Sequence, residues 1–168
     1  MEQSMNERLR RKVSDLGERL ASRGERLCTA ESCTGGWIGQ AVTSVSGSSA
    51  WFDSGFVTYS NEAKMKMLGV KAGTLDRYGA VSAETVREMA AGALAGSRAD
   101  WAVAVSGVAG PDGGTADKPV GLVWLAWMRR GSEPQTRRFL FDGDRDTVRL
   151  KSVEAAVEGL LDRIGCRE

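Results

Sequence analysis

The chain has 168 residues, of which 42% are apolar and 27% are charged, and this composition predicts one globular domain over residues 1–168. Its formal net charge of +1 gives no general reason to expect a nucleic-acid partner, and no apolar run approaches the ~20 residues that span a bilayer. The chain has no histidine, which excludes a Ser-His-Asp triad, a Cys-His dyad and a histidine-ligated metal.

The three cysteines, Cys28, Cys33 and Cys166, are an odd number without a Cys-x-x-Cys spacing. Reduced thiols in a cytoplasm are the simplest interpretation. The segment from Met1 to Lys12 is polar and charged, without the apolar core of a secretory signal. We therefore expect a cytoplasmic protein that has no membrane partner.

Apolar residues recur at helical spacing in several segments, as they do between Leu9 and Leu20. Shorter runs of aromatic and β-branched residues indicate strands between them. In chain order the pattern predicts a helix over 5–23, a strand over 26–30, a helix from a cap at Thr34 to Gly47, a strand over 52–59, a helix over 61–68, a helix from a cap at Ser82 to about residue 94, strands over 101–106, 120–128 and 136–141, and a helix from about Asp144.

The order of these elements indicates the fold class. Helices alternate with short strands through most of the chain, which favours a three-layer α/β domain with a mixed sheet. The polar turn around Gly131 joins the last two strands, so we expect these two to form an antiparallel pair.

The turn over residues 29–36, Thr-Ala-Glu-Ser-Cys-Thr-Gly-Gly, lies between a predicted strand and a predicted helix. Such a turn presents Ser32 as a candidate nucleophile, with the free amides near Gly35 and Gly36 as an anion-binding site. The alternative is that Ser32 and Thr34 only cap the helix. Cys33 is a rival nucleophile, but adjacent side chains point in different directions, so a buried filler is the better interpretation for it.

The segment from Tyr59 to Lys64 follows the next strand, at the edge of the sheet where ligands bind in open α/β folds. Because the chain has no histidine, a lysine is one of the few available bases, and burial would lower the pKa of Lys64 enough for that role. Tyr59 could relay a proton or orient the lysine. The alternative is an ordinary solvated helix face.

Two further segments carry candidate binding residues. The glycine-rich loop that begins with Ser106 and Gly107 follows the apolar strand over 101–106 and suits a phosphate or a ribose, although it lacks the Gly-Lys-Ser/Thr of a P-loop. Arg145 near a helix start could hold a phosphate with two hydrogen bonds, or could simply pair with a neighbouring aspartate. Asp144 suits the cap of the same helix.

Together these motifs resemble the CinA C-terminal domain family. The likeness rests on Thr-Ala-Glu-Ser-Cys-Thr-Gly-Gly, Gly-Ser-Ser-Ala-Trp-Phe, Val-Thr-Tyr-Ser-Asn-Glu-Ala-Lys, Gly-Ala-Val-Ser, Ser-Gly-Val-Ala-Gly-Pro-Asp-Gly-Gly and Lys-Pro-Val-Gly, in that order between about residues 8 and 160. It implies an α/β/α sandwich with a mixed, mostly parallel five-stranded sheet. The chain looks like the stand-alone form, without the additional domain of longer members.

The resemblance implies hydrolysis of the carboxamide of nicotinamide mononucleotide to nicotinate mononucleotide and ammonia. Ser32 would be the nucleophile, Lys64 and Tyr59 would complete the site, and Ser106, Gly107 and Arg145 would lie on the nucleotide side. Amides near Thr34 and Gly35 would stabilise the oxyanion. The scheme needs no metal and no cofactor.

Several alternatives stay open at this point. Lys64 could bind phosphate instead, and Glu31 could activate a water directly. The chain could be a non-catalytic nucleotide-binding module that regulates a partner. A role in DNA uptake or damage response is disfavoured by the near-neutral charge. A homo-oligomer, with a dimer as the first guess, is the expected assembly.

Overall fold

The computed structural model describes residues 2–165, so Cys166 lies outside the described part of the chain. A five-stranded sheet with the order β2-β1-β3-β4-β5 forms its centre. The strands are β1 (Leu27–Glu31), β2 (Phe52–Val57), β3 (Trp101–Gly107), β4 (Leu122–Arg129) and β5 (Gln135–Leu140).

The sheet is mixed, as predicted. Strand β1 pairs in parallel with β2 and β3, because helical crossovers connect these strands. The β3–β4 and β4–β5 pairs are antiparallel, and β4 and β5 follow one another across the turn at Gly131, which has a φ of +82°. Parallel and antiparallel pairings are thus equal in number, so parallel pairing is less dominant than we expected.

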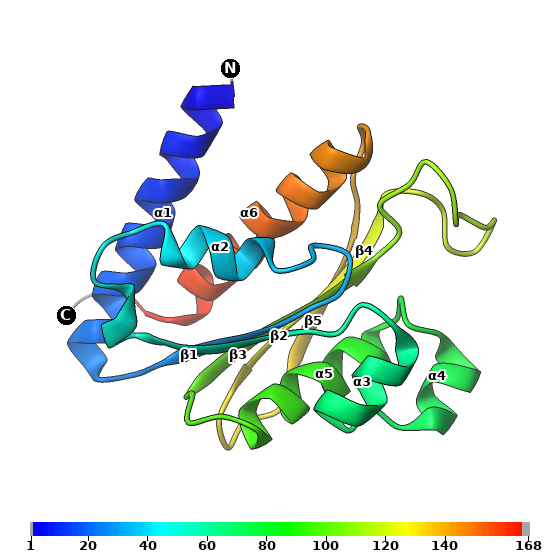
Figure 1. The fold of residues 1–168 in the computed structure, drawn as a ribbon, viewed down its shortest axis with the longest axis horizontal. Coiled ribbons are helices and arrows are strands. Elements are labelled where there is room, and N and C mark those ends of the chain that lie inside the picture. The colour runs from blue at the N-terminus through cyan, green and yellow to red at the C-terminus, as the bar shows by residue number, and fades with distance from the viewer. Residues whose placement is uncertain (1, 166–168) are drawn as a thin grey trace.

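Helices cover both faces of the sheet, which confirms the three-layer prediction. Helices α1 (Glu2–Arg23), α2 (Trp37–Thr43) and α6 (Arg145–Arg163) lie on one face, and α3 (Asn61–Leu68), α4 (Ala72–Tyr78) and α5 (Ala83–Ala95) lie on the other (Figure 1). Alternate residues of β3 serve the two cores. Val103 and Val105 pack in the core beneath α1, α2 and α6, whereas Ala102 and Ala104 pack against α5.

The caps show where local sequence was a good guide. The Ser82 hydroxyl accepts a hydrogen bond from the Thr85 amide at 3.2 Å, and the Asp144 carboxylate accepts one from the Thr147 amide at 2.9 Å, so both predicted N-caps are confirmed. The cap predicted at Thr34 is wrong. Helix α2 begins after Gly36, which has a φ of +102°, and no side chain caps it at that position.

Two elements differ from the sequence prediction in other ways. Helix α4 was not predicted, because Leu75 is its only buried residue and the segment therefore lacks an apolar period. A short 3₁₀ turn, η1 (Ser48–Ala50), lies between α2 and β2. The described residues contain no helix long and apolar enough to cross a membrane.

The parallel part of the sheet determines where chemistry can occur. Strands β2, β1 and β3 are neighbours, and their carboxyl ends meet at one edge. Ser32 directly follows β1, Thr58 and Tyr59 follow β2, and Ser106 lies at the end of β3. Three segments that are far apart in the sequence therefore converge there.

Candidate active site

Ser32 and Lys64 meet at the carboxyl edge of the sheet. The Lys64 amine lies 2.9 Å from the Ser32 hydroxyl oxygen, and both side chains are buried, with 1% and 7% of their surfaces exposed. The two residues come from different elements, since Ser32 follows β1 and Lys64 lies on α3. A hydroxyl within hydrogen-bond distance of an amine is the arrangement that an activated serine requires.

Strand alternation explains why Ser32, and not Cys33, faces the lysine. Ala30 packs in the core on the α5 side, and Ser32 continues that face two residues later. Cys33 points the other way and packs in the core beneath α1, α2 and α6. Burial raises the pKa of the Cys33 thiol to about 11, so this side chain is a neutral filler at neutral pH.

Lys64 is surrounded by acceptors but has no counterion. Its amine donates to the carbonyl oxygens of Thr58 at 2.9 Å and Tyr59 at 3.1 Å, and no carboxylate within residues 2–165 forms an ion pair with it. Burial therefore lowers the pKa of Lys64, because only the charged form loses hydration. The interpretation of this segment as an ordinary solvated helix face does not hold for Lys64.

Tyr59 contributes its backbone and its hydroxyl to different partners. Its carbonyl accepts from Lys64, whereas its ring is 62% exposed and its hydroxyl oxygen accepts from Arg145 at 3.3 Å. Arg145, the first residue of α6, also donates to the Gly110 carbonyl at 2.8 Å. Arg145 does not pair with the neighbouring Asp146, which instead lies 3.5 Å from Arg149.

These groups surround a cavity of about 290 Å³. Seven of the residues singled out in the sequence line it: Ser32, Cys33, Tyr59, Lys64, Ser106, Gly107 and Arg145. The cavity also has lining residues that the sequence analysis did not propose, among them Asn61, Val81 and Asp112. Their signal was indirect: each lies in a motif that carried the family resemblance, but the sequence analysis assigned no role to these three residues themselves.

Ser106 and Gly107 have different roles in this geometry. Ser106 is buried, and its hydroxyl makes no hydrogen bond to the described residues, so it is free to serve a ligand. At Gly107 a Cβ atom would lie 2.7 Å from a Val123 methyl group and 3.0 Å from the Leu122 carbonyl oxygen. The close approach of β4 therefore explains this glycine without a ligand.

Thr34, Gly35 and Gly36 lie outside the cavity lining, and the start of α2 is not an open anion site. The buried Glu31 carboxylate already accepts hydrogen bonds from the amides of Ile38 at 2.8 Å and Gly39 at 3.0 Å, and from the Thr34 hydroxyl at 2.6 Å. The carboxylate takes the favourable position at the helix N-terminus. The same contacts turn it away from Ser32.

The amides of the turn divide into used and unused donors. The Gly35 amide donates to the Ser32 carbonyl at 3.0 Å, and the Trp37 amide donates to the Thr34 carbonyl at 3.0 Å. Within residues 2–165 the amides of Cys33 and Thr34 have no protein acceptor. The Gly36 amide likewise has no acceptor there. Of these three residues only Cys33 lines the cavity, so its amide is the donor available to a ligand.

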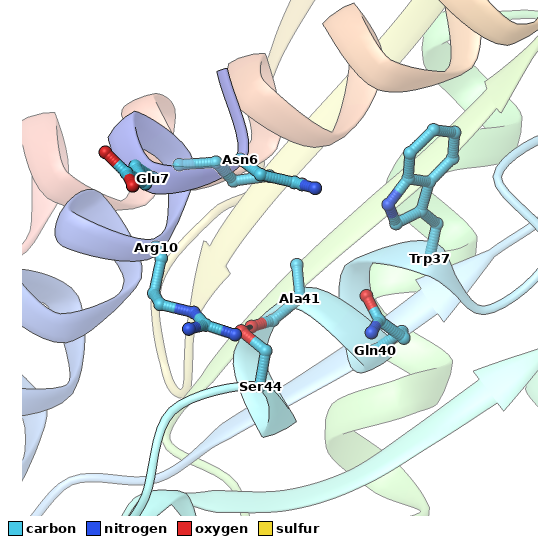
Figure 2. A pocket seen from close by; sticks show the side chains of 8 residues that line it. Asn6, Glu7, Arg10, Trp37, Gln40, Ala41 and Ser44 are labelled. Carbon is cyan, nitrogen blue, oxygen red and sulfur yellow. Dashed lines mark hydrogen bonds between the residues drawn. The ribbon is translucent and has the colours of Figure 1, made fainter. Parts of the chain in front are cut away.

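A second hollow, of about 300 Å³, lies between α1 and α2. Figure 2 shows Asn6, Glu7, Arg10 and Gln40 around it, with Trp37 at one end. The Ser44 hydroxyl beside it donates to the Ala41 carbonyl at 2.6 Å, so this serine has no adjacent base. In the part of the chain that the structure describes, no group of three or more acidic or cysteine side chains is arranged to hold a metal ion.

Comparison with known proteins identifies the family of the chain. The model of the CinA C-terminal domain matches residues 9–164. The chain is 54% identical over 145 residues to the nicotinamide-nucleotide amidohydrolase PncC of Escherichia coli strain K12, with 86% of this chain and 88% of that protein covered. It is 56% identical over 146 residues to the protein of the same name from Pseudomonas putida, with 87% and 91% covered.

A solved structure supports the same assignment. The crystal structure of a competence-damaged protein (CinA) superfamily protein from Klebsiella pneumoniae 700603 superposes with a TM-score of 0.89 at 41% sequence identity, and the match covers 93% of this chain and 97% of that one. With its three-layer fold and its match over residues 9–164, the chain belongs to the CinA C-terminal domain family.

Proposed function

We propose that the protein is an amidohydrolase that converts nicotinamide mononucleotide to nicotinate mononucleotide and ammonia. The observation that carries this proposal is the 2.9 Å contact between the buried Lys64 amine and the Ser32 hydroxyl in a cavity of about 290 Å³. Relatives at 54% and 56% identity are named nicotinamide-nucleotide amidohydrolases, which supports the choice of substrate.

The neutral amine that the proposed reaction needs can also make the three contacts of Lys64. A neutral amine has two N–H donors and one lone pair. The carbonyls of Thr58 and Tyr59 take the two donors, which leaves the lone pair for the Ser32 hydroxyl. Lys64 then accepts the Ser32 proton as the hydroxyl oxygen attacks the carboxamide carbon.

The proton that Lys64 takes from Ser32 completes the acylation step. The Lys64 ammonium donates it to the departing nitrogen, ammonia leaves, and an acyl-enzyme ester forms at Ser32. A water molecule then attacks the ester with Lys64 again as the base, which releases the carboxylate. During both steps the Cys33 amide, which has no protein acceptor and belongs to a cavity-lining residue, is the available donor for the oxyanion.

The nucleotide end of the substrate lies near Tyr59 and Arg145, whose side chains contact each other. Arg145 is the cationic group there, and its planar guanidinium suits a phosphate. The unpaired hydroxyl of Ser106 also lines the cavity, where it serves the ribose or the carboxamide of the substrate. The free thiols of Cys28 and Cys33 support a cytoplasmic setting for this reaction.

Ammonia release from nicotinamide mononucleotide in excess EDTA tests the proposal directly. We expect turnover by the native protein, a loss of at least ~10³-fold in Ser32→Ala, and native rates in Ser22→Ala, whose hydroxyl is on α1, far from the cavity. Turnover retained by Ser32→Ala would move the nucleophile elsewhere. No turnover by the native protein, together with retained nucleotide binding, would favour the non-catalytic binding module.

A further inference from the structure

Ser106 is a buried serine whose hydroxyl has no partner among residues 2–165. Only 1% of its surface is exposed, and what is exposed lines the cavity of about 290 Å³. The other buried serines of the described chain, Ser32, Ser82 and Ser152, all form hydrogen bonds through their hydroxyls. Because buried polar groups are nearly always hydrogen-bonded, an unpaired hydroxyl at a cavity wall indicates a ligand contact.

The pairing of β1 with β3 places Ser106 beside Ser32. The two strands are parallel, with Glu31 opposite Val105. The Ser32 amide then donates to the Val105 carbonyl at 3.1 Å, which continues the ladder by one step and makes Ser106 the neighbour of Ser32. Since neighbouring strands lie about 4.8 Å apart, one small group bound at Ser32 is within reach of both residues.

Strand alternation brings both hydroxyls to the same face of the sheet. Ala30 and Ala104, each two residues earlier, pack in the core on the α5 side. Ser32 and Ser106 continue this face at the edge of the sheet, where the Lys64 amine lies 2.9 Å from the Ser32 oxygen. Ser106 forms no hydrogen bond to either of these two groups, so its proton stays available to a substrate.

A backbone donor lies beside the nucleophile as well. The Cys33 amide has no acceptor within residues 2–165, and Cys33 lines the cavity. The turn that carries it is held by two hydrogen bonds, from the Gly35 amide to the Ser32 carbonyl at 3.0 Å and from Arg149 Nε to the Cys33 carbonyl at 3.1 Å. In other hydrolases the amide after the nucleophile forms half of an oxyanion hole, and a neighbouring segment supplies the second donor.

We propose that Ser106 is a catalytic residue, whose hydroxyl binds the carboxamide oxygen and donates the second hydrogen bond to the oxyanion. This inference rests on the proposed function and assigns Ser106 to the carboxamide and not to the ribose. As the Ser32 oxygen bonds to the carboxamide carbon, Lys64 takes the Ser32 proton and the π electron pair of the carbonyl moves to its oxygen. Ser106 keeps its own proton throughout. When the carbonyl forms again, the carbon–nitrogen bond breaks and the Lys64 ammonium donates its proton to the departing nitrogen.

The proposed role changes the rate more than the affinity. A hydrogen bond to an oxygen that gains negative charge becomes stronger in the transition state than it is in the bound substrate. A hydrogen bond to a ribose hydroxyl is the same in both states, so its loss would weaken binding and leave the rate of the bound substrate unchanged. Rate and affinity therefore distinguish a carboxamide contact of Ser106 from a ribose contact.

The test measures both quantities. Ammonia release is followed in a single turnover, with enzyme in excess over nicotinamide mononucleotide, and the dissociation constant of the same nucleotide is measured in a Ser32→Ala background. Ser106→Ala removes the hydroxyl, and Ser106→Thr keeps one. Ser152→Ala is the matched control, because Ser152 is also buried but lies on α6 and donates to the Val148 carbonyl at 2.7 Å.

We expect Ser106→Ala to slow the single turnover about a hundredfold, as loss of one oxyanion donor does, while the dissociation constant changes by less than about threefold. Ser106→Thr should stay within about tenfold of the native rate, and Ser152→Ala should have the native rate. In urea, Ser106→Ala should be at least as stable as the native protein, because it loses no hydrogen bond to the described residues. If Ser106→Ala does not fold, Ser106→Cys, with its weaker S–H donor, replaces it and should slow the turnover at least about tenfold.

Three outcomes would overturn the inference. The first is a native single-turnover rate in Ser106→Ala. The second is a weaker dissociation constant that accounts for the whole effect, which would assign the hydroxyl to the ribose. The third is a marked loss of stability in Ser106→Ala, which would identify a structural hydroxyl. A native protein that releases no ammonia would contradict the proposed function itself, whereas an active native protein with an unaffected Ser106→Ala variant would contradict only the role of Ser106.

Discussion

Glu31 is the buried carboxylate nearest in sequence to the nucleophile, and its contacts predict that it is a structural support and not a base. We expect Glu31→Gln to keep more than about a tenth of the native kcat and to lose stability, because a general base replaced by its amide would lose at least ~10²-fold in rate. The structure gives the reason. The carboxylate oxygens are occupied by the Thr34 hydroxyl and by the amides of Ile38 and Gly39.

The magnitude follows from those three contacts. In Glu31→Gln the remaining carbonyl oxygen can still accept from Thr34 and Ile38, but the NH₂ group faces the Gly39 amide, which donates across 3.0 Å in the native protein. One unsatisfied buried donor costs about 1–3 kcal/mol. In Glu31→Ala all three donors lose their acceptor, and we expect a loss of about 3–5 kcal/mol in the free energy of unfolding.

Urea denaturation at neutral pH measures both values, and thermal unfolding gives a second reading, at about 2–4 °C for each kcal/mol in a chain of this size. Glu133→Gln in the exposed turn between β4 and β5 is the matched control, with an expected change below about 0.5 kcal/mol. The reasoning is wrong if Glu31→Gln unfolds like the native protein yet loses its activity, since that pattern would identify Glu31 as the group that activates water.

Two further predictions concern the cavity. Burial lowers the pKa of Lys64 below its ordinary value of 10.5, and only the neutral amine accepts a proton. We therefore expect kcat/KM to rise with pH through the lowered pKa and then to level off. A profile that is flat between about pH 6 and 10 would argue against Lys64 as the base. Arg145→Gln should raise KM about 10- to 100-fold with little change in kcat, because charge-assisted hydrogen bonds to a phosphate are lost equally in the ground and transition states. A fall in kcat alone would instead place Arg145 near the reacting atoms.

The sequence was sufficient for the parts of the fold that depend on period and on local caps. Apolar spacing identified the five strands and most of the helices, and short polar side chains identified the caps at Ser82 and Asp144. The pairing of Ser32 with Lys64 could also be predicted from the sequence. Both residues follow parallel strands, and the absence of histidine left few other bases.

Contacts between distant segments account for what the sequence did not predict. Thr34 has the character of a cap, but Glu31 reaches past it to the amides of α2, and local pattern does not show how far a glutamate side chain extends. Gly107 was interpreted as a ligand contact, whereas the approach of β4 requires it. Arg149 lies 116 residues from Cys33, and nothing in its neighbourhood in sequence marks it as a partner of the turn.

The charges around the cavity also give the proposed substrate a direction. An anion would ordinarily favour the start of α2, but Glu31 already occupies the amides there, so a phosphate has no helix terminus to bind at that end. Lys64 lies beside Ser32 with a lowered pKa, and in its neutral form it offers a phosphate little attraction. Asp112 repels one. Arg145 is then the remaining cationic lining residue, at the mouth of the cavity beside Tyr59. A phosphate held there leaves the uncharged carboxamide to enter toward Ser32, which is the orientation that the chemistry requires.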